Sequence, residues 1–550
     1  MTMEATRVDF DKETGIGPTD PEGEFDPEER RLLEDVQGNI LKSHGRDHSR
    51  HLFIRFDPAQ RDAARSWLAG MADQVTSGME QWNQSRRREQ IFARAGFGPA
   101  AVSAGAEIGR QPSVTMGGQA GPLGIAMTAG LGGMPGVSVS PPAADGRGPE
   151  DPEAYLSAEL REHPSPPFVC LMLSAAGYRA LGLTDLPDDA AFRRGSRDEE
   201  TRSKLCDPPV AEWHQGFREA HHALIVVADD DARRVQQKAD GIRDSLTAAG
   251  AGKVAHQEIG KVIRLRPNGP PREHFGFADG ISEPLFFAKD IAKAGQSEPG
   301  RKWNPGAPLK LVLTRDPGGD LETGYGSYFV YRKLEQDVPK FNEQRLKLAR
   351  ALAEADGRDH PHEGDKELAG AYMVGRFRDG MPAHLPATAR GTDDAVPNDF
   401  DFGEDQEGNK CPYQSHIRKT NPRGDTVWRF NSTLAEERTH RIARRAISYE
   451  SERTVGLLFL CAQSDISAQF EFMQERWCNN INFIAGGDDG KAATGQDPVV
   501  GIGSSDTPGQ WPRKYGKPER TSVGLAESVR LRGAEYFFVP SRSFLRSVRP

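Results

Sequence analysis

The chain has 550 residues, more than a single hydrophobic core normally serves, so two globular units are expected. Hydrophobic residues make up 36% of the chain and charged residues 27%, which is typical of a soluble globular protein with long loops. The formal net charge of −9 argues against nucleic acid or an anionic membrane as a partner, because both attract a basic surface, and no apolar stretch is long enough to span a bilayer.

Residues 1–35 are acidic and interrupted by proline and glycine, which predicts a disordered acidic leader. They lack a basic region followed by an apolar run, and no twin-arginine signal opens the chain. The five cysteines are scattered without a CxxC pair, which predicts neither a disulfide framework nor a zinc site. We therefore expect a cytoplasmic protein with reduced thiols.

Alternating strand and helix patterns predict a first domain over residues 36–290. Strands are predicted at residues 51–56, 168–173, 223–228 and 262–265. Helices are predicted after Asp57 and after residues 229–231, because aspartate is a favoured N-cap and apolar residues then recur at helical spacing. This order is the split βαβ arrangement of ferredoxin-like domains. A segment rich in glycine, alanine and proline at about 96–153 interrupts it, and its low apolar content predicts an insertion.

Residues 291–550 repeat the same order. Strands are predicted at residues 328–332, 372–377, 455–461 and 536–539. Asp337 and Asp465 each precede a helical pattern, and the second pattern places Trp477 on its apolar face. The sequence therefore predicts an α+β fold of two ferredoxin-like domains, with antiparallel sheets and peripheral helices.

Two segments place single charged residues in unusual surroundings. In the first, Gly276 and Gly280 bracket Asp279, and glycines allow the backbone to approach a bulky group. Taken alone, that segment is equally well a surface turn in which Asp279 binds its own backbone. In the second, Arg444 precedes the apolar strand at residues 455–461, where an unpaired buried charge would be unfavourable.

A third segment, residues 411–423, contains His416 among the basic residues Arg418, Lys419 and Arg423. A neutral imidazole is a common ligand of haem iron, and basic side chains can bind the two haem carboxylates. The chain has 14 histidines, and most histidines are solvated or hydrogen-bonded residues without a metal. The basic residues, taken singly, are equally well a solvated face.

In this order the three segments resemble the dye-decolourising (DyP-type) haem peroxidases. The GxxDG signature stands at residues 276–280, the proximal HIRKxNPR-like segment at residues 416–423, and the distal I-x-R-x4-Y pattern at Ile442, Arg444 and Tyr449. Further matches at residues 36–41, 375–377, 470–474 and 532–538 extend the resemblance over nearly the whole chain. The length and the long loops resemble the larger bacterial subgroup. The resemblance implies a pair of ferredoxin-like domains of the dimeric α+β barrel type, with the C-terminal domain binding haem.

The resemblance also implies an enzyme that reduces hydrogen peroxide. Such enzymes hold one non-covalent haem b per chain, and the absence of a CxxCH motif excludes covalent c-type attachment. They oxidise dyes, phenols or other one-electron donors, including Mn(II), through a ferryl and porphyrin-radical intermediate. The physiological reductant and the formation of a homo-oligomer stay open.

By position, the resemblance assigns roles to nine side chains. It places Asp279 and Arg444 as the distal catalytic pair, His416 as the fifth iron ligand, Leu457 and Phe459 as the distal wall, Arg418 and Arg423 as the residues holding the haem, and Tyr449 and Trp477 as electron relays toward surface substrates. Trp477 also completes the apolar face of its own predicted helix, which favours a core position first and a relay second.

The residue types suit these roles. A carboxylate such as Asp279 can move a proton between the two oxygens of peroxide, and the fixed charge of Arg444 can stabilise the departing oxygen. A histidine ligand donates more electron density when its second nitrogen binds an acid. The family often has an acid two residues after Asp465, but this chain has Ser467, so we expect Asp465 or a backbone carbonyl as the partner of His416.

Four other functions differ from a peroxidase in features that can be named. A haem carrier or sensor would not need Asp279 and Arg444. A chlorite dismutase-like enzyme typically has the distal arginine without the GxxDG aspartate. Removal of iron from haem has no residue in its favour, and a haem-free structural protein would purify colourless.

Overall fold

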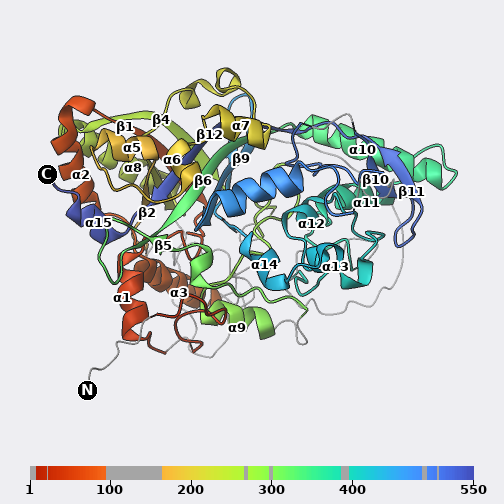
Figure 1. Ribbon diagram of the computed structural model, residues 1–550, viewed down its shortest axis with the longest axis horizontal. Coiled ribbons are helices and arrows are strands. Elements are labelled where there is room, and N and C mark those ends of the chain that lie inside the picture. Colours follow the sequence, from red (N-terminus) through yellow and green to blue (C-terminus); the bar gives the residue numbers. More distant parts are fainter. Residues whose placement is uncertain are drawn as a thin grey trace, which may run out of the picture.

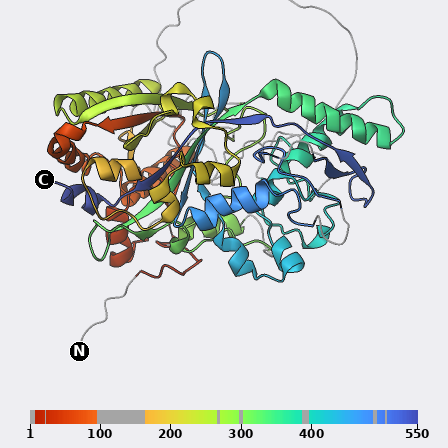
Figure 2. The ribbon, with the colours of Figure 1, turned by 45° about the horizontal axis from the view of Figure 1, so that its top comes forward.

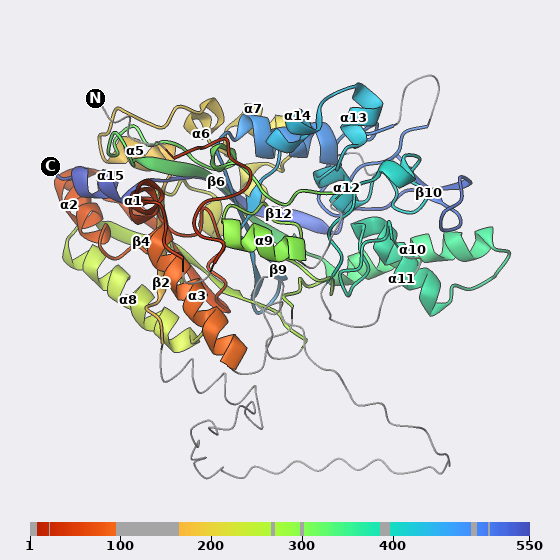
Figure 3. The same ribbon diagram turned by 90° about the horizontal axis from the view of Figure 1, so that it is seen from below.

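The computed structural model describes residues 8–20, 23–94, 164–265, 270–296, 302–385, 396–485, 492–503 and 507–550. The predicted insertion at about 96–153 lies outside the described residues. A large curved sheet occupies one side of the molecule, and a part containing α10 to α13, β10 and β11 projects from the other side (Figure 1). The same division is seen in the two turned views (Figures 2 and 3).

The N-terminal half of the sheet is ferredoxin-like. Its strands are β1 (His48–Phe56), β2 (Phe168–Leu173), β3 (Ala223–Asp229) and β4 (Gly252–Lys261), in the antiparallel order β4-β1-β3-β2. Helices α2 (Arg61–Met71) and α8 (Ala232–Ala248) connect these strands and bury the apolar stripes that their sequences predict. The split βαβ prediction is confirmed for this half.

The C-terminal half repeats the arrangement. Strands β6 (Tyr325–Gln336), β7 (Ala443–Arg444), β8 (Ile447–Glu450), β9 (Val455–Gln463) and β12 (Val529–Val539) follow the order β12-β6-β9, with β7 and β8 both pairing β9. Helix α10 (Val338–Ala355) follows β6, and two π-helical turns, η7 (Ser467–Glu471) and η8 (Met473–Cys478), follow β9. Asp465 caps this second helical segment through a hydrogen bond from the Ala468 amide, as its sequence predicts.

The two halves share one sheet. The last strand, β12, pairs with β6 along its length and with β2 at Phe538 and Leu173. At the other end of the order β4 lies against β8, where a Cβ added at Gly260 would stand 2.5 Å from Ile447 Cγ2. Alternate residues of each strand enter different apolar cores, as in β9, where Leu458 and Leu460 join the core that contains Phe53 and Tyr331. The predicted α+β architecture is confirmed.

The remaining elements connect and cover this sheet. The other helices are α1 (Pro27–Asp35), α3 (Gly78–Arg94), α5 (Ala175–Ala180), α6 (Ala190–Arg194), α7 (Glu199–Leu205), α9 (Ala288–Gln296), α11 (Glu363–Val374), α12 (His416–Thr420), α13 (Asp425–Phe430), α14 (Leu434–Thr439) and α15 (Arg542–Ser547). The other strands are β5 (Thr314–Arg315), β10 (Gly509–Pro512) and β11 (Arg520–Val523). None of the described helices is both long and apolar enough to cross a lipid bilayer. All five cysteines are free thiols.

Two predicted strands are wrong. Residues 372–374 close α11, which ends at Gly375 in the left-handed conformation, and residues 375–377 are not a strand either. A short apolar run does not distinguish a buried helix from a strand, and here the helix packs on α10. Residues 262–265 lie beyond β4, and Leu265 is 71% exposed. The strand that forms in this region is β4, which the sequence pattern did not predict because its solvent-facing residues are polar.

The predicted disordered leader is also wrong for residues 8–20 and 23–35. Asp26 caps α1, whose Leu32 and Leu33 are buried. Ile16 forms a parallel bridge with Phe287, and its side chain is buried in the apolar core. A few apolar residues in an acidic segment are enough to dock it, because the rest of the fold supplies the surface.

Candidate active site

A cavity of about 1060 Å³ is lined by residues of β6, β9, β12 and α12, and it extends to residues of the N-terminal half such as His44 and Arg88. Leu457 and Phe459 project into it from β9, because residues two apart on a strand share a face. Asp279, His416 and Arg444 line the same cavity. The structure thus brings together three residues that are up to 165 positions apart in the sequence.

His416 is the first residue of α12, and its ring is fixed by a carboxylate. Nδ1 lies 2.8 Å from Asp497 Oδ2, and the Asp497 side chain is fully buried. The other oxygen of Asp497 accepts hydrogen bonds from the amides of Val499 and Val500. These bonds hold Asp497 as an acceptor, so Nδ1 of His416 carries the proton and Nε2 presents its lone pair to the cavity.

The expected partner of His416 was therefore wrong. Asp465 caps the helical segment after β9 and does not contact His416. The carboxylate bound to His416 is that of Asp497, 81 residues later in the sequence. The sequence carries no pattern that links these two positions, because the contact depends on how the loop after η8 returns to α12.

Asp279 and Arg444 form a loose pair. Arg444 Nη1 lies 3.5 Å from Asp279 Oδ1, which also accepts a 2.7 Å hydrogen bond from the Gly280 amide. Asp279 therefore binds the backbone of its own turn and also lies beside Arg444, so both interpretations of this residue are correct. Both side chains are about one-third exposed, 28% for Asp279 and 34% for Arg444, so both are accessible from the cavity.

Glu283 is a member of this site that the sequence reasoning did not single out. Its Oε1 lies 2.6 Å from Arg444 Nη2, and its Oε2 accepts a hydrogen bond from the Arg444 amide. Arg444 Nη2 also donates to the Ile281 carbonyl. Burial opposes the charge of Arg444, but Glu283 and Asp279 outweigh it and raise the pKa of the guanidinium above its ordinary value. The arginine is a permanent cation with a fixed orientation.

Of the two arginines expected to hold the haem, Arg418 is misassigned. It is fully buried, and its five N–H groups are used by Asp425, Asp405 and the Cys411 carbonyl. Lys419 is also buried and donates to the carbonyls of Asn480 and Phe483. On a helix, residues two apart point to different sides, so Arg418 turns away from the cavity that His416 faces.

Arg423 does line the cavity, and two further arginines join it. Arg423 and Arg376 both donate to Ser282 Oγ and Asn398 Oδ1. Arg423 and Arg441 both lie against the Trp303 ring, at 4.9 and 5.8 Å from its centroid. Burial and the neighbouring Arg438 lower the pKa of Arg441, whose hydrogen bonds go to two backbone carbonyls. These three arginines give one part of the cavity wall a positive charge.

Comparisons with known proteins bear on this geometry. Residues 161–268 match the model of the DyP dimeric alpha+beta barrel domain, and residues 304–482 match that of the C-terminal domain of Dyp-type peroxidases. The chain is 37% identical over 410 residues to Multifunctional dye peroxidase DyP2 of Amycolatopsis sp., a match covering 70% of this chain and 82% of that protein. The chain belongs to the DyP-type peroxidase family.

Other members of the DyP-type family agree in sequence and fold. A dye-decolorizing peroxidase of Exidia glandulosa is 32% identical over 411 residues, covering 69% of this chain and 75% of that one. The crystal structure of a DyP-type peroxidase from Anabaena sp. superposes with a TM-score of 0.76 and 34% identity, covering 99% of this chain and all of that one. DyP2 from Amycolatopsis superposes with a TM-score of 0.75 and 29% identity, over 98% of this chain and all of that one.

The two aromatic residues assigned as relays in this DyP-type peroxidase are buried and stand outside the described lining of the cavity. Trp477 stacks on Phe483 at 5.4 Å and meets Phe472 edge-on, so it occupies the core position that its helical pattern favours. Tyr449 lies on β8 beneath Lys333, whose Nζ stands 4.7 Å from the ring centroid. Electron transfer through either residue stays a prediction.

Proposed function

We propose that the cavity binds one non-covalent haem b per chain, with His416 as the protein ligand of the iron and Asp279 and Arg444 as the residues that act on hydrogen peroxide. The observation that carries this proposal is that His416, with Nδ1 bound to Asp497, lines the same cavity as the Asp279–Arg444 pair. An imidazole whose second nitrogen binds a carboxylate is a strong axial donor.

The chemistry of the cavity wall fits the group. Leu457 and Phe459 offer an apolar surface to a flat macrocycle. Arg423 and Arg441 supply charge for the two haem carboxylates, and an arginine held only by carbonyls gains a charge-assisted hydrogen bond when a carboxylate arrives. The volume of about 1060 Å³ is slightly above the range of about 300–1,000 Å³ for small-molecule and cofactor sites.

Asp279 and Arg444 divide the work on peroxide. Oδ1 of Asp279 is held by the Gly280 amide and faces Arg444, whereas Oδ2 makes no hydrogen bond with the described residues. Oδ2 is therefore the oxygen that would move a proton from one oxygen of peroxide to the other. Arg444 stabilises the negative charge that develops on the departing oxygen. When bound, the haem supplies the iron that holds peroxide and the electrons that reduce it.

The reductant is a small one-electron donor such as a dye, a phenol or Mn(II). The names of the relatives support this class, since two of them are called a multifunctional dye peroxidase and a dye-decolorizing peroxidase. A homo-oligomer is compatible with the domain family that residues 161–268 match.

The test is a haem titration of the purified protein followed by peroxide. We expect absorbance in the Soret region to saturate at one haem per chain, to shift on addition of hydrogen peroxide, and to return when a phenol is added. The proposal would be contradicted if the protein bound no haem from an excess in solution, or if it bound haem without consuming peroxide.

A further inference from the structure

A second group of ligand-type side chains lies on β4, among residues that the peroxide chemistry does not use. His256 and Glu258 are two residues apart on this strand and point to the same face. His256 Nε2 lies 2.7 Å from Glu258 Oε1. Lys333 of β6 also binds Oε1, at 2.6 Å. The other oxygen of Glu258, Oε2, makes no hydrogen bond with the described residues.

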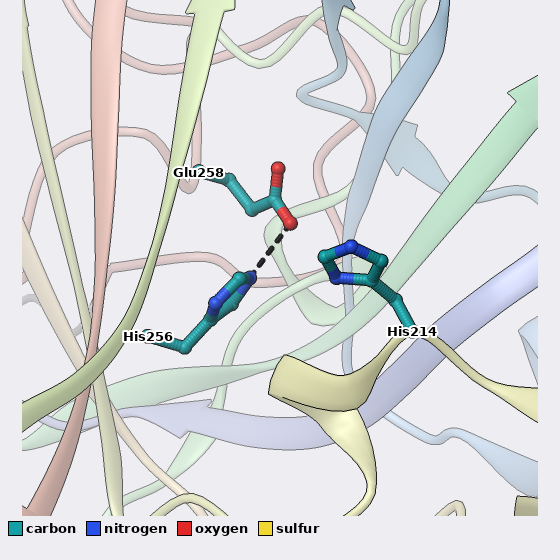
Figure 4. Close-up of side chains that lie close together, drawn as sticks. All are labelled: His214, His256 and Glu258. Atoms are coloured by element: carbon teal, nitrogen blue, oxygen red, sulfur yellow. Dashed lines mark hydrogen bonds and ion pairs between the residues drawn. The ribbon is translucent and has the colours of Figure 1, made fainter. Parts of the chain in front are cut away.

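His214 approaches this pair from another segment. It lies between the short turns η3 (Val210–Glu212) and η4 (Gln215–Phe217), and its amide donates to the Arg532 carbonyl of β12 at 2.7 Å. One donor atom from each of His214, His256 and Glu258 lies within 4.8 Å of the other two. Figure 4 shows the His214 ring on one side and the His256–Glu258 pair on the other. The His214 ring makes no hydrogen bond with any described residue, and it is exposed to solvent.

We propose that His214, His256 and Glu258 bind a divalent transition-metal ion of the imidazole-preferring class, such as zinc, at a site separate from the haem cavity. Two imidazoles and one carboxylate are a donor set of zinc sites that keep a fourth position for water. Manganese(II) is disfavoured, because it prefers sites made of oxygen donors. The two histidines and the glutamate are all absent from the lining of the haem cavity.

The surroundings hold the ligands close to the required positions. A Cβ added at Gly216 would stand 2.3 Å from His256 Nδ1, so the absence of a side chain there lets the backbone of η4 pack directly on the ring. Ligand atoms on a tetrahedral zinc ion lie about 3.3 Å apart when each bond is about 2.0–2.1 Å. Closing the site needs the ligand atoms to approach by up to about 1.5 Å, and the exposed His214 side chain is free to make this movement.

Lys333 sets the strength of the site. Its charge already neutralises Glu258 through Oε1 and repels an incoming cation, while Oε2 stays available as the third ligand. The same ammonium group lies over the Tyr449 ring. A bound ion would therefore add a positive charge beside the lysine that covers Tyr449, and it would tie the residue 214 turn to the edge of the sheet.

The experiment uses the haem-loaded, tag-free protein and zinc(II). Equilibrium dialysis with elemental analysis measures zinc bound per chain, with His214→Ala as the test variant and His360→Ala, a change of an exposed histidine between α10 and α11, as its matched control. We expect one zinc site per chain in the wild type and in His360→Ala, and at least a tenfold weaker affinity in His214→Ala.

Two further measurements make the result specific. Zinc should raise the Tm of the wild type and not that of His214→Ala, because an ion that binds only the folded state stabilises it. The zinc K-edge X-ray absorption of the wild type should contain two imidazole ligands. Equal zinc affinity in wild type and His214→Ala, or a spectrum without paired imidazoles, would overturn the site. Neither readout depends on peroxide turnover.

Discussion

The Glu283 carboxylate holds Arg444 at two points, with Oε1 2.6 Å from Nη2 and Oε2 accepting a 2.8 Å hydrogen bond from the Arg444 amide. The side chain of the arginine is thereby aimed past Asp279 and into the cavity. Glu283 does not itself need to meet peroxide to affect its reduction, because the position of the Arg444 charge depends on it.

We predict that Glu283→Gln slows the reaction with hydrogen peroxide about 10- to 100-fold, because a hydrogen bond between charged groups contributes about 1.5–3 kcal/mol. Stopped-flow absorbance of the haem-loaded variant gives the rate. Glu283→Asp keeps the charge and should recover part of it, while haem content stays at the wild-type level. A Gln variant as fast as wild type would show that Ile281 and the strand are sufficient to position Arg444.

The two residues of the distal pair should be separable by pH. Arg444→Leu removes a fixed charge and should slow the peroxide reaction at every pH, by an amount corresponding to roughly 2.7–4 kcal/mol. Asp279→Asn removes the base, should slow the reaction about 10²–10⁴-fold, and should also change the pH profile of the rate. An Asp279→Asn profile parallel to that of the wild type would exclude Asp279 as the base.

The contact between His416 and Asp497 predicts a change in the iron itself. Asp497→Asn weakens the acceptor of the His416 Nδ1–H hydrogen bond, so the Fe(III)/Fe(II) potential should rise and haem affinity should fall about 10- to 100-fold. Spectroelectrochemistry and haem transfer to apomyoglobin measure these quantities. Asp465→Asn is the matched control, since that aspartate caps a helix, and it should change neither quantity. His416→Ala should retain little haem.

Replacement of Arg418 should lower the stability of the fold, whereas replacement of Arg441 should lower haem affinity. Arg418→Met leaves Asp425 and Asp405 buried without their cation and should lower the free energy of unfolding by about 3–5 kcal/mol. Arg441→Met removes a buried cation whose hydrogen bonds, among the described residues, go to two backbone carbonyls, so the apoprotein should keep its stability and lose haem affinity. Urea denaturation and haem titration of both variants distinguish the two roles. A stable Arg418→Met with weak haem binding would restore the original assignment.

Lys419 predicts a pH dependence of stability. Burial lowers its pKa to about 7, whereas in the unfolded chain it is close to 10.4. Between these values the unfolded state binds more protons, so the free energy of unfolding rises with pH, by up to about 1.4 kcal/mol per pH unit. Below pH 7 Lys419 is protonated in both the folded and the unfolded state, so it contributes no pH dependence to the free energy of unfolding there. Urea denaturation between pH 6 and 10 should show this rise in the wild type and a smaller one in Lys419→Met.

The sequence was informative where one residue type serves one local purpose. The uninterrupted apolar runs of β2 and β3 and the capping aspartates before α8 and α10 depend on near neighbours, and they were predicted correctly. His416, Asp279 and Arg444 were found because their segments resemble a known family, and the structure places them on one cavity.

What the sequence did not reveal is the choice of long-range partners. Arg418 and Arg423 stand in one basic stretch, yet only Arg423 reaches the cavity, because Asp425 and Asp405 bind the other. Asp497 and Glu283 are single acids among 80 acidic residues, and their roles depend on loops that fold against distant elements. Arg441 lies three residues before Arg444, and no local pattern in the sequence predicts its place on the cavity.

The last strand of the chain, β12, pairs with both β2 and β6, and β2 to β12 spans more than 350 residues. Until β12 has left the ribosome, the edges of β2 and β6 that it pairs with lack a neighbour, and the cavity wall lacks Val529 and Leu531. We expect haem capture to follow the synthesis of β12, so a cell starved of haem would accumulate a folded, colourless precursor. Chains truncated before β12 would expose two sheet edges and aggregate instead.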